Sequence, residues 1–234
     1  MRRIFLSPSS ARILHNICSC IRTLISNPAS GDLRHVVQTI NALPSNYLGK
    51  LTVIINDLSS STACRNILIL LVLGTISDKT LAADIALHFW YSVFMPVEYT
   101  LHMSAVLVSF LASITEGGQK FSVPLGPRST LFVCISRADA EHLKHFISQS
   151  ISMEKAQDEY DRVRGSPSRE DYRERMYSAL RPSHRLAFQQ YRRFGIILPF
   201  GAPNAHFNAP NNSLFSSRGE WLQTDYADPL GGWE

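Results

Sequence analysis

The sequence predicts an α/β protein with a Rossmann-like, mostly parallel sheet flanked by helices. The main observation is the segment 24–73, which has in order a strand, a glycine turn, a helix, a second strand and an acidic residue. This order begins a doubly wound nucleotide-binding sheet. The second observation is that helices separate the predicted strands, the last of which is an apolar run at 130–135. Strands separated by helices favour a sheet that pairs mostly in parallel.

The elements of the segment 24–73 follow from its apolar spacing and its breaks. The first strand ends at Ser30-Gly31-Asp32, where the Asp32 carboxylate can cap the next helix. That helix spans 33–43, because its apolar residues recur every three or four positions. The short β-branched run 51–55 suits a strand buried on both faces, and Asp57 follows it. A helix begins near Thr62, and its residues 67–76 are apolar on all sides. Length and the preceding serine and threonine residues favour a helix there over the alternative, a strand, and we expect the segment deep in the core.

The middle of the chain contains two long predicted helices and a further strand. The helices cover 80–95 and 97–114 and separate at Pro96, because proline lacks an N–H and clashes with the preceding turn. Glycine and proline residues over 116–127 indicate a loop or linker. A strand at 130–135 and a helix at 138–150 complete this part of the predicted fold.

The two ends of the chain differ from its centre. Residues 153–193 alternate charges of both signs, which is typical of solvated helices. A Pro/Gly-rich irregular tail follows, and we expect His206, Phe207 and Phe215 to anchor it. Residues 1–22 are basic and amphipathic, without an acid. This start is typical of a mitochondrial presequence, and the competing interpretation is a first helix of the fold. We therefore predict an N-terminal segment 1–22, an α/β domain at 23–152, and a charged helical segment with a tail at 153–234.

Composition excludes several classes of protein. The 234 residues are 45% hydrophobic and 18% charged, as in an ordinary globular chain rather than a disordered one. A net charge of +4 without a basic, aromatic stripe gives no reason to expect nucleic-acid binding. The four cysteines lack zinc spacing, which favours reduced thiols and a cytoplasmic location, with mitochondria as the alternative. No apolar run approaches the length of a transmembrane helix.

The predicted cofactor-binding residues are Ser30, Gly31, Asp32 and Asp57. In nucleotide-binding α/β folds, a glycine lets the backbone approach the ligand, and an acid after the second strand accepts hydrogen bonds from the ribose. The competing interpretation is structural: Asp32 caps a helix, Asp57 ends a strand, and the site is vestigial. A single glycine and the charge of Asp32 beside the turn favour this second interpretation.

Other polar residues have structural interpretations. We expect His88, which stands beside Trp90 and Tyr91, to be a hydrogen-bonded core histidine. Arg65 is expected to pair with a carboxylate, because a buried charge needs a partner. His142 and His145 are three residues apart, but no third ligand is near in sequence, so we predict no metal site.

Several separate blocks of the sequence resemble the fungal domain of unknown function 4470. These blocks are ASGDLRHVV at 29–37, IND at 55–57, CRNIL at 64–68, LHFWYS at 87–92, LRPSHR at 180–185, LPFGAP at 198–203 and ADPLGGW at 227–233. The resemblance implies a relation to the amino-terminal domain of dynein axonemal assembly factor 3. It also implies a methyltransferase-like Rossmann fold, with S-adenosylmethionine as the natural ligand. We expect the sheet of this chain to be incomplete.

The expected function follows from this resemblance and from the single glycine of the turn. The first hypothesis is an intracellular, methyltransferase-like protein without catalytic activity or cofactor, which acts in interaction or assembly with an unknown protein partner. The alternative is an S-adenosylmethionine-dependent methyltransferase of unknown acceptor. No residue of the sequence can be assigned a catalytic role.

Overall fold

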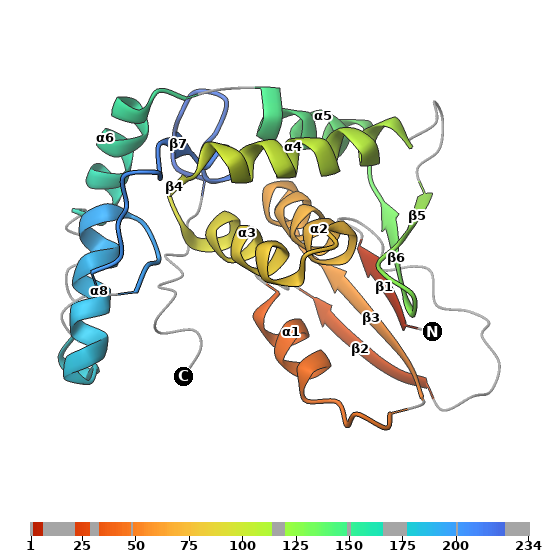
Figure 1. Cartoon of the computed structure of the whole chain (residues 1–234). Helices are drawn as coiled ribbons and strands as arrows, with labels where there is room; N and C mark the ends of the chain where they lie inside the picture. Colours follow the sequence, from red (N-terminus) through yellow and green to blue (C-terminus); the bar gives the residue numbers. More distant parts are fainter. Residues whose placement is uncertain are drawn as a thin grey trace. The chain divides into compact units, whose positions relative to one another are not determined.

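The computed structural model describes residues 2–6, 22–28, 33–47, 49–113, 120–148, 151–165, 177–199 and 201–222. The chain, whose helices and strands are labelled in Figure 1, divides into two units. Unit 1 contains Met1–Ala82 and Ala105–Lys144, and unit 2 contains Ala83–Ser104 and His145–Glu234. Each unit is described by itself.

Unit 1 contains a five-stranded sheet with the order β2-β3-β1-β6-β5. Its strands are β1 (Arg2–Leu6), β2 (Arg22–Pro28), β3 (Lys50–Asn56), β5 (Lys120–Pro124) and β6 (Ser129–Cys134). Strand β1 pairs in parallel with β3 and β6, and β2 pairs in parallel with β3. Strand β5 is antiparallel to β6 and forms one edge of the sheet. Along β3, Leu51, Val53 and Ile55 are buried and the residues between them are half-buried, so one face is covered more fully than the other.

The helices α1 (Arg34–Asn41) and α2 (Ser60–Thr75) complete unit 1, together with part of α4 (Val97–Ala112) and the part of α5 (Arg137–Ser148) that ends at Lys144. Helix α2 begins after Ser59, whose side chain accepts a hydrogen bond from the Thr62 N–H. It then buries every residue over 63–72, as expected for a helix that is apolar on all sides. In the described part of the chain, no helix has both the length and the apolar character needed to cross a membrane.

Unit 2 is helical around an irregular C-terminal segment. Its elements are most of α3 (Lys79–Tyr91), the start of α4, α6 (Met153–Arg164), α8 (Pro182–Phe194), and a 3-10 turn at Asn212–Leu214. Strands β4 (Phe94–Met95) and β7 (Ala209–Pro210) form a short antiparallel pair. Phe207 and Phe215 are buried in the core of this unit, which confirms that they anchor the tail. His206, by contrast, is exposed.

The predicted fold class, a Rossmann-like (methyltransferase-like) domain, is wrong for this chain. The described residues are mostly helical, and unit 2 contributes only the short antiparallel pair β4–β7 instead of further strands of a parallel sheet. Strand β2, which precedes the predicted glycine turn, lies at the sheet edge rather than at its centre. A doubly wound nucleotide site lies where the strand order reverses, next to a central strand. The local order of elements at 24–73 therefore does not produce the predicted arrangement.

The sheet contains two strands that the sequence did not predict. Strand β1 comes from the N-terminal segment, which we interpreted as amphipathic, and residues 7–21 of that segment lie outside the described residues. Strand β5 occupies part of the predicted linker at 116–127. Both strands have only five residues and are defined by pairing with distant strands, so they have little local signal. The central position of β1 is what displaces β2 toward the edge.

Candidate functional site

The predicted cofactor site is described only at Asp57, because Ser30, Gly31 and Asp32 lie outside the described residues. Asp57 directly follows β3 and is half-buried. Its Oδ1 accepts a hydrogen bond from the Ser59 N–H at 2.9 Å, which turns the chain into α2. Asp57 thus stabilises the strand-to-helix turn, and its role with a cofactor stays a prediction.

A second carboxylate of unit 1 caps helix α5. The Asp139 Oδ2 accepts hydrogen bonds from the Ser136 N–H at 2.8 Å and from the Ser136 hydroxyl at 2.7 Å. Burial raises the pKa of Asp139, but these hydrogen bonds and one from Ser60 outweigh it and hold the pKa below its ordinary value. The Cys64 thiol donates to the Asp139 carbonyl oxygen at 3.6 Å, and burial raises the pKa of Cys64 to about 12. A thiol protonated at neutral pH is a poor nucleophile, so this cluster holds α5 in place.

In unit 2, His88 and Ser92 form a buried pair at the end of α3. The His88 Nδ1 lies 2.9 Å from the Ser92 Oγ, which also accepts a hydrogen bond from the Ile197 N–H at 3.2 Å. Burial lowers the pKa of His88, while nearby Asp84 opposes the shift. A serine beside a neutral histidine resembles a nucleophile–base pair. However, Ser92 is fully buried, so a substrate cannot reach it, and the predicted core histidine is confirmed.

Asn211 connects the C-terminal segment to the same end of α3. Its Nδ2 donates to the carbonyl oxygens of Phe89 at 2.8 Å and of Ser92 at 2.9 Å. Its Oδ1 accepts a hydrogen bond from the Ser213 hydroxyl at 2.7 Å. Asn211 is buried, so its side chain takes the place of water at two carbonyl groups where α3 ends. Sequence reasoning missed this residue, because nothing local separates it from the other asparagines of the tail.

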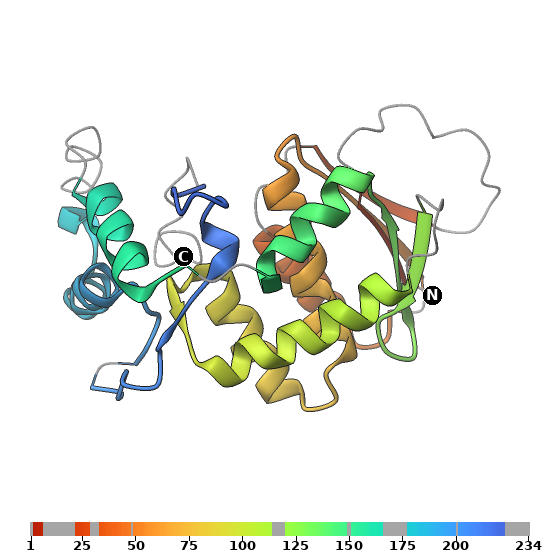
Figure 2. The same ribbon diagram turned by 90° about the horizontal axis from the view of Figure 1, so that it is seen from above.

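Tyrosine hydroxyl groups fix the position of helix α8, which ends at a glycine with a left-handed backbone conformation. Pro182 opens the helix, and Gly195 ends it with a φ of 67°. The Tyr191 hydroxyl donates to the Tyr91 carbonyl oxygen at 2.8 Å, and the Tyr160 hydroxyl donates to the Tyr191 carbonyl oxygen at 2.9 Å. Helices α6 and α8 therefore lie side by side (Figure 2). These contacts fix which side of α8 faces solvent.

The opposite side of α8 is exposed and carries both basic and apolar side chains. Leu186 is 51% exposed and Phe194 is 37% exposed. The Arg192 guanidinium lies over the Phe188 ring at 5.7 Å, and the Arg193 guanidinium lies over the Phe194 ring at 5.1 Å. We call the exposed residues Leu186, Gln189, Arg193 and Phe194, together with the half-buried Arg192, the α8 face. It is the strongest candidate for a functional surface, because its apolar and cationic groups together reach solvent.

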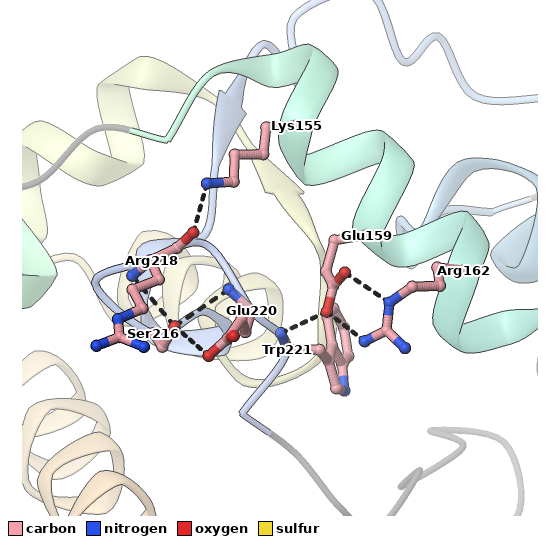
Figure 3. A network of polar contacts seen from close by, with 7 residues as sticks. All are labelled: Lys155, Glu159, Arg162, Ser216, Arg218, Glu220 and Trp221. Atoms are coloured by element: carbon pink, nitrogen blue, oxygen red, sulfur yellow. Dashed lines mark hydrogen bonds and ion pairs between the residues drawn. The ribbon is translucent and has the colours of Figure 1, made fainter.

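Polar residues of α6, in contrast, are occupied by the C-terminal segment (Figure 3). The Glu159 carboxylate accepts hydrogen bonds from the Trp221 N–H at 2.8 Å and from the Arg162 guanidinium at 2.6 and 2.8 Å. The bonds from Arg162, and then that from Trp221, keep the pKa of Glu159 below its ordinary value against the opposing effect of burial. The Lys155 amine donates to the Arg218 carbonyl oxygen. This network holds the chain at 216–222 against α6.

A comparison with protein families matches part of the chain. Residues 15–95 match the domain of unknown function DUF4470. The resemblance that the sequence predicted is confirmed over these residues, which include α1, β3, α2, α3 and β4. The α8 face and Asn211 lie outside the DUF4470 match, whereas Asp57, His88 and Ser92 lie inside it. No curated protein and no solved structure matches the chain.

The described residues also bear on metal binding. Among them, no group of three or more His, Cys, Asp or Glu side chains is arranged to hold a metal ion. His142 and His145 lie on α5, and the His145 Nε2 is 3.3 Å from the Phe215 carbonyl oxygen. His145 is therefore placed to contact the C-terminal segment of unit 2.

Proposed function

We propose that this protein is a protein-binding domain that acts in interaction or assembly rather than in catalysis. The observation that carries the proposal is the α8 face, where Leu186 and Phe194 are exposed beside two arginines. Arginine and aromatic residues are enriched where proteins bind each other, since they combine apolar area with directed hydrogen bonds. Exposed apolar side chains beside such groups are typical of a surface that a partner covers.

The roles of the reactive side chains in the described chain support a binding function. The Asp57 carboxylate holds a turn, and the His88–Ser92 pair ties the end of α3 to the chain after α8. Each of these residues lies within the DUF4470 match. Their contacts stabilise a scaffold, and it is the surface of that scaffold that meets other molecules.

The α8 face can be tested by substituting one exposed leucine. The measurement is the amount of partner protein that co-purifies with the chain. We expect the L186E variant to recover at least about tenfold less of that partner than the wild type does, because a buried unpaired charge costs more than 1.4 kcal/mol. The matched control is L58E, since Leu58 is 94% exposed and lies in unit 1. Equal recovery of all partners by the wild type and both variants would contradict the proposal.

Calorimetry separates this proposal from the methyltransferase alternative. We expect a titration of the purified chain with S-adenosylmethionine, at high micromolar concentrations, to show no saturable heat. The reason is that the strand before the predicted glycine turn lies at the sheet edge, and Asp57 already accepts a backbone hydrogen bond. One-to-one binding that the Asp57→Ala substitution abolishes would overturn the binding-domain proposal in favour of an enzyme.

A further inference from the structure

We propose that the α8 face binds an acidic, amphipathic segment of the partner protein. This inference rests on the proposed function and adds the chemistry of the partner. The bound segment presents apolar side chains to Leu186 and Phe194 and carboxylates to Arg192 and Arg193.

The stretch of chain around α8 is strongly basic. Residues 177–199 contain four arginines and neither aspartate nor glutamate, which is an excess of four positive charges. The whole chain has a net charge of +4, so this short stretch carries an excess equal to that of the entire protein. The preceding helix α6 shows the mixed charges expected of a solvated face, such as Asp158, Asp161 and Arg162. Complementarity therefore favours an acidic ligand at α8.

Two of the four arginines are available for a ligand. In the described part of the chain, no ion pair includes Arg192 or Arg193, although both stack on aromatic rings. Stacking orients a guanidinium and leaves its N–H edge open, so it can donate two parallel hydrogen bonds to a carboxylate. Arg185 is already used, since it donates to the carbonyl oxygens of Leu180 and Ser178 at 2.9 Å each.

Part of the positive charge has a structural role. Arg192 and Arg193 lie in the last turn of α8, where cations interact favourably with the helix dipole. That role accounts for charge at this end but not for the exposure of Leu186, which lies about two turns earlier on the same side as Arg193. Apolar and cationic groups side by side match a segment that combines carboxylates with apolar residues.

Neighbouring carboxylates favour a protein over a nucleic acid. Asp161 of α6 pairs with Arg164 at 2.7 Å, and the Arg164 guanidinium also donates to the Arg192 carbonyl oxygen. A carboxylate is thus held close to the basic end of α8, where it repels a continuous line of phosphates. A peptide with separated carboxylates can avoid it. Exposed Leu186 likewise offers nothing to a phosphate backbone, whereas it fits an apolar side chain.

The experiment measures the binding of a labelled peptide to the full chain by fluorescence anisotropy. The probe is a synthetic helical peptide with leucine on one side and glutamate on the other, and its matched form has glutamine in place of glutamate. We expect the glutamate peptide to bind at least about tenfold more tightly than the glutamine peptide. The R192Q/R193Q double variant should weaken that binding by about tenfold, because two charge-assisted contacts are lost.

A charge-matched control distinguishes the α8 face from general attraction. Arg128 and Arg137 are exposed residues of unit 1, so R128Q/R137Q removes the same charge elsewhere and should leave peptide binding unchanged. Equal weakening by both double variants would overturn the inference, and so would tighter binding of a single-stranded oligonucleotide than of the glutamate peptide. If L186E loses its partner while neither peptide binds, the proposed function stands and the acidic partner is rejected. If L186E keeps its partner as well, both proposals fail.

Discussion

Replacing Asn211 by alanine is expected to lower the free energy of unfolding by about 3 kcal/mol. The Asn211 side chain donates to two buried carbonyl oxygens, those of Phe89 and Ser92, and accepts from Ser213. Alanine removes these hydrogen bonds, together with one from the Ser213 N–H at 3.3 Å, and leaves the two carbonyl groups without their side-chain donor. A buried polar group that loses its partner costs about 1–3 kcal/mol. Urea denaturation followed by tryptophan fluorescence measures the difference.

The neighbouring residue provides a control for this substitution. The Asn212 Nδ2 lies at 3.4 Å from the Phe146 carbonyl oxygen and Asn212 is only half-buried, so Asn212→Ala should cost less than about 1 kcal/mol. If Asn211→Ala costs no more than Asn212→Ala, the link between the C-terminal segment and α3 does not stabilise unit 2. In that case the segment at 211–222 contributes through its apolar side chains alone.

Local patterns predicted the helices well, because their signals lie within a few residues of one another. Apolar spacing at 33–43 predicted α1, and the serine and threonine residues before 67–76 predicted the start of α2. Asn211 has no such signal, since its acceptor in Phe89 is 122 residues away in sequence. A side chain that satisfies distant carbonyl groups is defined by the tertiary fold rather than by its neighbours in the chain.

The sheet shows how a correct local interpretation leads to a wrong fold. Strand β3 and helix α2 occur where the sequence predicted them, and Asp57 follows β3 as expected. The predicted cofactor-binding site also required the strand before Gly31 to be a central strand of the sheet. The position of that strand depends on which strands pair with one another. Strand β1 pairs with both β3 and β6, which places β2 at the edge. Pairing partners of short strands are decided by packing, which local propensity does not encode.

The basic character of the α8 face is visible in the sequence, but the many charges of both signs before it made it hard to recognise. We interpreted residues 153–193 as one solvated segment with alternating charges. In α6 that description holds, whereas the charged residues over 177–193 are all arginines. A separate count for each helix would have detected the change. The exposure of Leu186 and Phe194 is a different matter, because it depends on the side of α8 that packs through Phe188 and Tyr191.

Replacing Tyr160 by alanine is expected to have the largest effect, a loss of about 4 kcal/mol in the free energy of unfolding. Tyr160 of α6 is fully buried in the core of unit 2, where it packs with Phe215 and Trp221. Its hydroxyl also donates to the carbonyl oxygen of Tyr191 in α8. Alanine removes the ring, which leaves a cavity, and removes the hydrogen bond between the two helices. Chemical denaturation monitored by circular dichroism gives the magnitude.

The Tyr160→Phe substitution separates the ring from the hydroxyl group. Phenylalanine keeps the packing and removes the hydroxyl that donates to the carbonyl oxygens of Tyr191 and, at 3.4 Å, Arg192, so a loss of about 1 kcal/mol is expected. Because that hydroxyl helps to place α8, Tyr160→Phe should also weaken binding of the glutamate peptide, although Tyr160 is buried and does not touch it. A variant that loses stability but binds the peptide as tightly as the wild type would show that α8 is placed by its apolar contacts. The hydroxyl of Tyr160 would then stabilise unit 2 without orienting the α8 face.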